Sequence, residues 1–482
     1  LILGIILLIS LFFRTYKVID RFGFAGDGDL FSWIVKDILV NQHLRLSGQQ
    51  TSALGIFIGP LFYYLLTPFF LLFKMDPIGA IIPVTIIGIF TTLSYYFVFT
   101  KLFNNRVGLI VAFLHATLLS SVQFDRMVVP STLTNIWTVW YFFAIISISR
   151  GNYQVLPLLG ILIGLIWHIH IALIPALVAI PTAFLVSKKL PNKKNIILFL
   201  LTFSFTSLPL IVFEVRHNFQ QVVSLLNNFS TTREGATGLY KFILVINMIV
   251  KNINTLLFAP QSFNFTDNIY FASIILISAV FLIGRKIITF KEIVPLYVWI
   301  VGVILFFSLS SSPISEYYFA NIEIIFLFFT SLLLYLLFIS SIQGRYLVLG
   351  VLAIIFIKNA YFFISQDYYH KGYQEKKAVV DYIIQDAANK NFPCFAINYI
   401  TSPGENVGFR YFFFLKNVHL AVPGRGSPVY SIVIPEELAE SKVKFNHIGI
   451  IPPEEIPPRE LMAEACSGEN TNLTEPMGGY MN

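Results

Sequence analysis

Long apolar runs separated by short polar segments dominate the sequence. They predict eleven membrane-spanning segments, at residues 1–13, 78–100, 107–124, 131–149, 154–167, 169–187, 195–213, 268–284, 293–310, 320–340 and 345–364. The two segments around GLIWHIHIAL can also be read as one long broken helix. The opening run has only about 13 apolar residues where a span needs roughly 20, so we expect residues to precede Leu1, with a cleaved signal peptide as the alternative.

Composition agrees with this pattern. Of the 482 residues, 56% are hydrophobic and 12% are charged, and the mean hydropathy is +0.74. These values exclude an ordinary soluble protein and predict a polytopic membrane protein. Two cysteines, Cys394 and Cys466, allow at most one disulfide and do not make a metal site.

Basic residues fall in alternate loops between the predicted spans. They are Lys101, Arg106, Arg150, Lys188, Lys189, Lys193, Lys194, Arg285, Lys286, Lys291 and Arg345. The opposite loops hold the carboxylates Asp27, Asp29, Asp37, Asp125, Glu214, Glu234, Asp267 and Glu316. The positive-inside rule then places the basic loops in the cytoplasm, and the acidic loops on the outer face of the cytoplasmic membrane.

This orientation requires that residues 55–74, GIFIGPLFYYLLTPFFLLFK, do not cross the membrane. Gly59, Pro60 and Pro68 interrupt a helix there, and the aromatic residues suit an interface. We expect an interfacial or re-entrant segment in the outer leaflet, which makes the first outer loop about 60 residues long.

The chain changes character after residue 365. We predict a membrane domain at 1–365 and a small extracytoplasmic α/β domain at 366–482. Within the latter, residues 374–390 have the pattern of an amphipathic helix, PCFAINYI and SPVYSIVIP that of strands, and GENVGFRYFFFL that of a helix or a strand. It contains no nucleotide loop, zinc spacing or nucleophile elbow, which favours a structural or acceptor-docking role.

Acids, bases and aromatic hydroxyls cluster at the outer ends of the predicted spans. These candidate site residues are Asp27, Asp29, Asp125, Arg126, His168, His170, Glu214, Arg216, His217, Glu316 and Tyr317. Any single acid in a wet loop can be merely solvated. Together, at one membrane face, they predict a site that handles a lipid-linked phosphate.

Several motifs follow one another in a recognisable order. An aspartate in the first outer loop precedes GQQTS and GIFIGPLFYYLL, then come an Arg and a Pro at the outer end of the third span, the His168 and His170 pair, and RHNF after the seventh span. This order resembles bacterial glycosyltransferase family 39, whose relatives include protein O-mannosyltransferases and the lipid A aminoarabinose transferase. The resemblance implies an all-α GT-C membrane fold with about eleven helices, and inverting transfer of a sugar from a polyprenyl-phosphate donor to a protein, lipid or cell-envelope glycan.

The resemblance also implies roles for particular residues. Asp27 is expected to be the general base, with Asp29 orienting it or helping to hold a cation, although relatives often carry Asp-Glu where this chain has DGD. Arg216 and His217 would bind the donor phosphate, with Arg126 as a helper. The structural alternatives are that one aspartate caps a helix beginning near Leu30, and that Arg216 only snorkels to lipid headgroups. No organic cofactor is expected, and the need for a divalent metal is left open.

Two other classes of protein remain as alternatives. A transporter or flippase, or a polysaccharide ligase or polymerase, would also be polytopic; a transporter should carry ionisable groups at mid-span and two repeated halves. The sequence shows charges at span ends and no evident repeat. The second alternative is a non-catalytic relative with structural carboxylates. The expected partners are the lipid-linked donor, the bilayer and an acceptor, with no nucleic acid.

Overall fold

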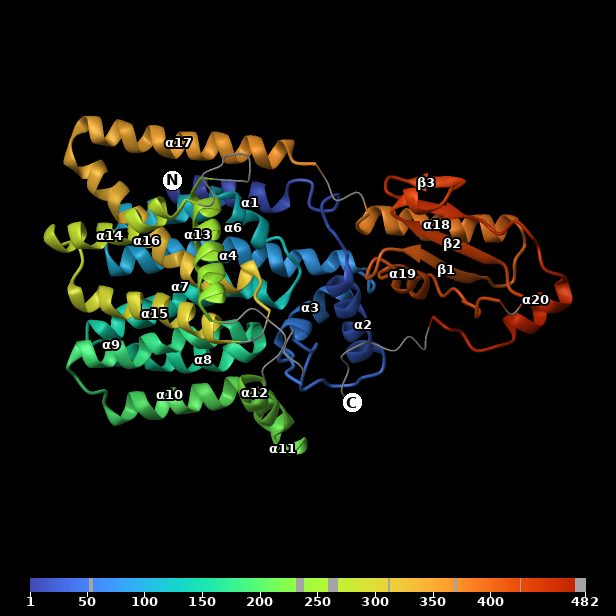
Figure 1. Ribbon diagram of the computed structural model, residues 1–482, viewed down its shortest axis with the longest axis horizontal. Coiled ribbons are helices and arrows are strands. Elements are labelled where there is room, and N and C mark those ends of the chain that lie inside the picture. The colour runs from blue at the N-terminus through green and yellow to red at the C-terminus, as the bar shows by residue number, and fades with distance from the viewer. Residues whose placement is uncertain are drawn as a thin grey trace. The chain divides into compact units, whose positions relative to one another are not determined.

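The computed structural model describes residues 1–51, 55–230, 238–258, 268–310, 313–367, 371–424 and 426–472 (Figure 1). The chain forms two compact units, which are described separately. The membrane unit comprises Leu1–Tyr16, Arg45–Phe62 and Val84–Gln366, and the tail unit comprises Lys17–Leu44, Tyr63–Pro83 and Asp367–Asn482. The last segment of the tail unit begins at Asp367, and its other two segments come from the first loop, within the predicted 1–365 domain. Ser52 of the GQQTS motif and the carboxylates Glu234 and Asp267 lie outside the described residues.

The membrane unit is a bundle of helices. They are α1 (Ile2–Thr15), α4 (Ile81–Leu102), α5 (Asn105–Thr117), α6 (Leu119–Phe124), α7 (Thr134–Ser149), α8 (Leu156–Ile169), α9 (Ala179–Ser187), α10 (Lys193–Thr206), α11 (Leu208–Arg216), α12 (Gln220–Ser230), α13 (Gly238–Phe258), α14 (Ile269–Gly284), α15 (Phe290–Leu309), α16 (Ala320–Ser340) and α17 (Ile342–Ser365). Short 3-10 helices η2 (Pro130–Leu133), η3 (Tyr153–Val155), η4 (Ile171–Val178) and η5 (Glu316–Phe319) join them. Apolar side chains fill the bundle, which is therefore a multi-pass membrane protein.

The structure does not confirm the predicted count of eleven spans. Among the described residues, six helices are long and apolar enough to cross a membrane, or seven if α10 and α11, which meet at a 60° bend, form one span. Several predicted spans are shorter apolar helices, because the backbone leaves the α-helical conformation within or beside them. The stretch at 107–124 divides into α5 and α6, and the extended backbone of His170 separates α8 from η4.

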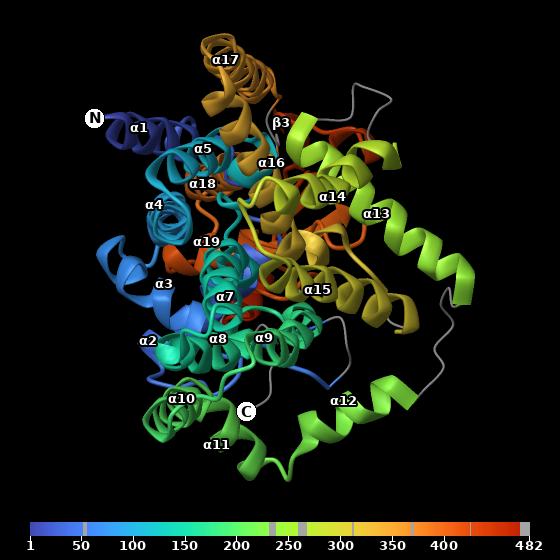
Figure 2. The same ribbon diagram turned by 90° about the vertical axis from the view of Figure 1, so that its left-hand side faces the viewer.

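Helix α13 is the long apolar helix that the sequence analysis did not identify. Its length and composition would suffice for a span. However, Figure 1 shows α13 running across the direction of α16 and α17, and Figure 2 shows it lengthwise where α17 is seen nearly end-on. Lys241, Lys251 and Asn252 interrupt its apolar sequence, which is why hydropathy alone did not reveal it.

Small residues allow α8 and α10 to pack closely. A Cβ atom at Gly160 would lie 3.1 Å from the backbone nitrogen of Phe203, and closer still to the oxygen of Phe199. The hydroxyl of Thr202 donates a 2.9 Å hydrogen bond across the interface to the oxygen of Pro157. Close backbone approach at small residues is a common way for membrane helices to associate.

The tail unit combines two segments from the first loop with the C-terminal domain. It contains α2 (Gly26–Val40), most of α3 (Leu61–Leu72), η1 (Pro77–Ala80), α18 (Tyr373–Asn389), β1 (Ala396–Thr401), α19 (Phe409–Leu415), β2 (Val429–Ile434), η6 (Glu436–Leu438), β3 (Val443–Phe445), β4 (Ile448–Ile451) and α20 (Arg459–Cys466). With 12 residues, α3 is too short to cross a bilayer. This length agrees with the expectation that residues 55–74 do not span.

A four-stranded sheet of order β1-β2-β4-β3 forms the core of the C-terminal domain. Strands β1 and β2 are parallel, and the remaining pairs are antiparallel. The apolar face of α18, with Val379, Val380 and Ile383, is fully buried. A disulfide joins Cys394, before β1, to Cys466, at the end of α20. The predicted helix at 374–390 and the two predicted strands are confirmed, and the ambiguous GENVGFRYFFFL segment contains a helix.

Candidate functional site

The two aspartates of DGD lie in the first turn of α2. This helix begins at Gly26, and Ala25, whose backbone is extended, is its N-cap residue. Neither Asp27 nor Asp29 is therefore the cap, and the expected helix start near Leu30 was too late. Asp27 is exposed and Asp29 is half-buried. The backbone N–H groups of a first turn carry partial positive charge, so both carboxylates lie at the positive end of the helix dipole.

A buried lysine from the C-terminal domain lies near this turn. Lys376 of α18 is only 4% exposed. Burial lowers the pKa of its ammonium group from 10.5 to about 8, and the negative charges of Asp29 and Glu405 partly offset this effect. The sequence analysis did not identify Lys376, because 347 residues separate it from Asp29 and nothing in the QEKK motif distinguishes it from a solvated lysine.

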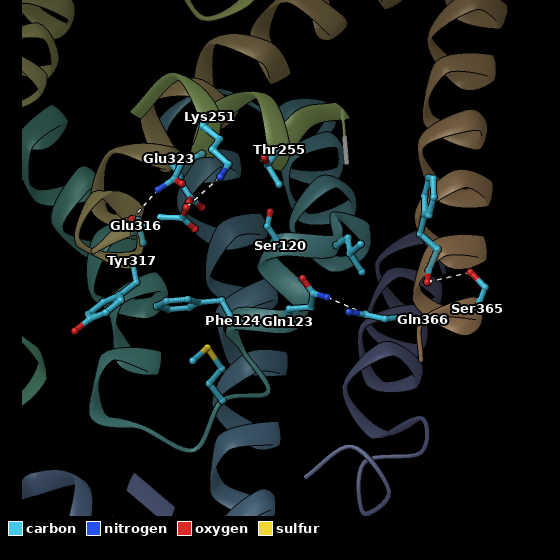
Figure 3. A pocket seen from close by; sticks show the side chains of 15 residues that line it. Ser120, Gln123, Phe124, Lys251, Thr255, Glu316, Tyr317, Glu323, Ser365 and Gln366 are labelled. Atoms are coloured by element: carbon cyan, nitrogen blue, oxygen red, sulfur yellow. Dashed lines mark hydrogen bonds and ion pairs between the residues drawn. The ribbon is translucent and has the colours of Figure 1, made fainter. Parts of the chain in front are cut away.

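The membrane unit contains a pocket of about 610 Å³ between α6, α13, η5, α16 and α17 (Figure 3). Its polar wall residues include Ser120, Gln123, Lys251, Asn252, Thr255, Glu316, Glu323 and Gln366, and Phe124, Met127, Tyr317 and Phe362 supply apolar and aromatic surface. Figure 3 shows the side chain of Lys251 pointing toward Glu316 and Glu323. Hydrogen-bonding groups beside aromatic rings are suited to a polar headgroup such as a sugar or a phosphate ester.

The charges in this pocket are only loosely paired. The ammonium of Lys251 lies 3.4 Å from Oε1 of Glu316, and both side chains are substantially exposed, by 41% and 60%. The amide of Asn252 donates a 2.6 Å hydrogen bond to the backbone oxygen of Glu316, and that of Gln123 donates a 2.9 Å bond to the side chain of Gln366. An exposed pair of this kind contributes little to stability, so a ligand anion could replace Glu316 as the partner of Lys251.

Asp125 and Arg126 hold the bundle together. Asp125 is buried and accepts hydrogen bonds from Arg14 and from the amide of Asn135, at 3.0 Å. The guanidinium of Arg126 donates bonds of 2.8 and 3.1 Å to the backbone oxygens of Phe13 and Tyr16. Both residues therefore fix α1 against the helices that follow it. These bonds favour a structural role over the predicted phosphate contact.

His168 and His170 make different contacts. His168 contacts the turn at Gly59 and Pro60 (the GP turn), where a Cβ atom at Gly59 would collide with the His168 ring. Nε2 of His168 lies 3.0 Å from the backbone oxygen of Thr206. His170 accepts a 3.0 Å bond from the backbone nitrogen of Ala172, and its ring lies 5.4 Å from that of Tyr317, which lines the pocket. His170 and Tyr317 are thus brought together, whereas His168 joins α8, α10 and the GP turn.

The FEVRHNF motif ends α11 away from the pocket wall. Glu214 is buried, His217 stacks on Phe213 with 4.1 Å between ring centroids, and Nδ1 of His217 lies 2.8 Å from the oxygen of Phe213. Arg216 is exposed. Glu214, Arg216 and His217 do not line the pocket at Lys251, whereas Glu316 and Tyr317 do. The structure therefore does not bring these predicted site residues together in one pocket.

Lys251 and Glu323 are pocket residues that the sequence analysis missed. Each is an ionisable residue within an apolar helix, which is a recognised signal of function in membrane proteins. Glu323 lies close enough to Asp125 for the two carboxyls to interact electrostatically. Within the part of the chain that the structure describes, no three His, Cys, Asp or Glu side chains come together to hold a metal ion.

Comparison with known proteins yields matches in structure only. No protein family and no curated protein matches the sequence. The structure is similar to ArnT from Cupriavidus metallidurans bound to undecaprenyl phosphate, with a TM-score of 0.58 and 10% identity over 93% of this chain and 97% of ArnT. It is also similar to the oligosaccharyltransferase of Archaeoglobus fulgidus in its apo form, with a TM-score of 0.52 and 15% identity over 96% of this chain and 77% of that protein. The chain therefore has the GT-C fold that the sequence motifs implied.

Proposed function

We propose that this protein transfers a sugar from a polyprenyl-phosphate donor to an acceptor outside the cytoplasmic membrane. The likeness to ArnT in complex with undecaprenyl phosphate carries the proposal, because it extends over 93% of this chain and 97% of that one. The polar residues of the pocket and the acids of DGD are groups that such a transfer requires. The donor is a hexosyl or pentosyl lipid phosphate, and the acceptor is a protein, a lipid or a cell-envelope glycan.

Asp27 is proposed as the general base. In an inverting transfer, the acceptor hydroxyl loses its proton as its oxygen attacks the anomeric carbon, and the lipid phosphate leaves from the opposite face. Asp27 is the more exposed of the two acids, so it can reach an acceptor. Asp29, half-buried beside Lys376, is suited to orienting the turn.

Lys251 is proposed as the residue that binds the donor phosphate. Its ammonium lines the pocket, and its exposed partner Glu316 can be displaced. Arg216, which the sequence favoured for this role, is the alternative, because it is an exposed cation at the end of α11. A cation at the leaving phosphate stabilises the charge that develops there as the glycosidic bond breaks.

Two observations support an outer location for the C-terminal domain. In the sequence, the predicted loops that carry the lysines and arginines named above alternate with the predicted loops that carry most of the carboxylates. In addition, Cys394 and Cys466 form a disulfide, and disulfides persist mainly outside the cytoplasm. Asp27 and Asp29 belong to the same unit as that domain.

Binding of undecaprenyl phosphate to the purified protein in nanodiscs tests the proposed donor site. We expect saturable binding of undecaprenyl phosphate and at least tenfold weaker binding of undecaprenol, which lacks the phosphate. Lys251→Gln should weaken binding of the phosphate about tenfold or more, whereas Lys286→Gln, in a basic loop, should not. If Arg216→Gln weakens binding and Lys251→Gln does not, the phosphate assignment moves to α11. Equal binding of the two lipids would refute a donor site for lipid phosphates.

A further inference from the structure

Helix α18 contacts the chain immediately before the acid-bearing turn. The backbone nitrogen of Tyr373 donates a 2.9 Å hydrogen bond to the oxygen of Phe22. At the neighbouring position, a Cβ atom on Gly372 would lie 2.6 Å from the same oxygen. Glycine is therefore required at position 372, because any side chain would push the first turn of α18 away from residue 22.

Lys376, one turn further along α18, binds the backbone of Phe24, two residues after Phe22. Its ammonium donates 2.9 Å hydrogen bonds to the backbone oxygens of Phe24 and Val407, and it lies 5.4 Å from the centre of the Phe409 ring. Phe24 is the residue before Ala25, the N-cap of α2. A buried ammonium is costly unless its hydrogen bonds are made. The bonds to these two carbonyls therefore stabilise both the buried lysine and the backbone that it contacts.

The ring and backbone of Phe24 are confined as well. Its φ angle of +37° lies in the left-handed region, which a bulky residue adopts only when its surroundings enforce it. Its ring packs against those of Phe412, at 5.0 Å, and Phe22, at 5.8 Å. A Cβ atom at Gly28 would lie only 3.1 Å from this ring. The glycine of DGD thus lets the turn with both aspartates lie directly on Phe24.

The same helix also holds the second loop segment of the tail unit. Asp76, which caps η1, accepts a 2.7 Å bond from the hydroxyl of Tyr373 and a 3.0 Å bond from the ammonium of Lys377. From α19, the hydroxyl of Tyr411 donates a further 2.9 Å bond to the oxygen of Met75. The start of α18 therefore fastens both the chain before α2 and the chain after α3.

We propose that Lys376 is a positioning residue for the transfer reaction, through which the C-terminal domain fixes the turn that carries Asp27 and Asp29. The proposal rests on the function proposed above. It gives the domain a part in the reaction, because the base can deprotonate an acceptor only if its turn is held within a fraction of an ångström of the productive position. Charged groups near Lys376 are Asp29 on α2, Glu405 before α19, and Lys371, which pairs with Glu405.

Kinetics of three variants test this role. Lys376→Met removes the donor and keeps the apolar stem, Lys376→Arg restores a buried cationic donor, and Lys416→Met makes the same change at an exposed pair with Asp381. With an undecaprenyl-phosphate sugar that the parent protein uses, we expect Lys376→Met to lower kcat about 10- to 100-fold while KM for the donor stays within about twofold. Lys376→Arg should recover part of kcat, and Lys416→Met should match the parent. An unchanged kcat in Lys376→Met would overturn the proposal.

Hydrogen exchange separates this proposal from the proposed function. In Lys376→Met, we expect faster amide exchange at residues 22–30, with exchange in the membrane unit and binding of undecaprenyl phosphate unchanged. If the parent protein transfers no sugar, the proposed function fails, and the exchange result still decides whether Lys376 holds the turn. Exchange that is unchanged at residues 22–30, or that rises throughout the protein, would contradict a positioning role.

Discussion

Nη2 of Arg14 lies 2.5 Å from Oδ2 of Asp125, and both side chains are buried, at 0% and 2% exposure. Nε of Arg14 donates a second bond to the same oxygen, at 3.0 Å, and His115 lies 3.6 Å away. The pair joins α1 to the end of α6, across 111 positions of the sequence. Asp125, which the sequence analysis proposed as a substrate-binding residue, thus connects two helices inside the bundle.

Removing one partner of this pair should destabilise the protein strongly. Asp125→Leu leaves the Arg14 guanidinium buried without its counter-charge, which costs about 3–5 kcal/mol. Replacing both residues, with Arg14→Met and Asp125→Leu, should recover most of that loss. Thermal unfolding of the purified variants in one detergent measures the effect. If Asp125→Leu were as stable as the parent, the ion pair between Arg14 and Asp125 would not be formed in the native bundle.

The packing of α8 against α10 should be sensitive to the size of the side chain at position 160. Gly160→Ala places a methyl group against the backbone of α10 and should cost about 1–3 kcal/mol through overpacking. Gly350→Ala on α17, where no atom lies within 4 Å of the new methyl group, is the matched control and should be neutral or slightly stabilising. Equal melting temperatures for the two variants would argue against the close contact of α8 and α10.

Lys376 should make stability depend on pH above neutrality. Its pKa is about 8 in the folded protein and 10.5 in the usual exposed state, so between these values the unfolded chain binds more protons and folded-state stability rises with pH. Relative to Lys376→Met, the parent should gain up to about 3 kcal/mol from pH 7 to pH 10. Melting curves of both proteins at several pH values provide the comparison. A difference that is constant with pH would contradict burial of the charged ammonium.

Labelling of introduced cysteines tests the orientation. Both natural cysteines are paired in the disulfide, so a single new cysteine is the thiol that reacts. A membrane-impermeant maleimide added to intact cells should label a cysteine at Gly426 in the C-terminal domain and miss one at Asn192 in the basic loop. The reverse pattern would place the acid-bearing loop in the cytoplasm and exclude an extracytoplasmic acceptor.

The helices were predictable where one physical signal dominates. Runs such as 320–340 and 345–364 are long and mostly apolar, so hydropathy located α16 and α17 within a few residues. Helix α13 was not found, because Lys241, Lys251 and its asparagines lower its hydropathy. Breaks such as the one at His170 depend on local backbone geometry, and they explain why the predicted count of spans exceeds the number of helices that are long enough to cross.

The site was predictable only in part, for a different reason. Sequence motifs drew attention to Asp27, Asp29, Glu316 and Tyr317, because polar residues at the ends of apolar runs stand out. They could not reveal that Asp125 pairs with Arg14, or that Lys376 lies beside the acid-bearing turn, since these relationships join distant parts of the chain. The resemblance to a family supplied the fold, and the hydrogen bonds of individual residues decide among their roles.

Release of polyprenyl phosphate from a labelled undecaprenyl-phosphate sugar is the most direct measurement of the central claim. The parent protein is tested with a panel of such lipid-linked sugars and an extract of cell-envelope acceptors. We expect it to release lipid phosphate from at least one of them. Asp27→Asn keeps the size and polarity of the side chain but removes the base, and it should reduce release about 100-fold or more, whereas Asp29→Asn should retain part of the activity. Parental activity in Asp27→Asn together with loss in Asp29→Asn would reverse the two roles. Full activity in both variants would contradict catalysis by this turn.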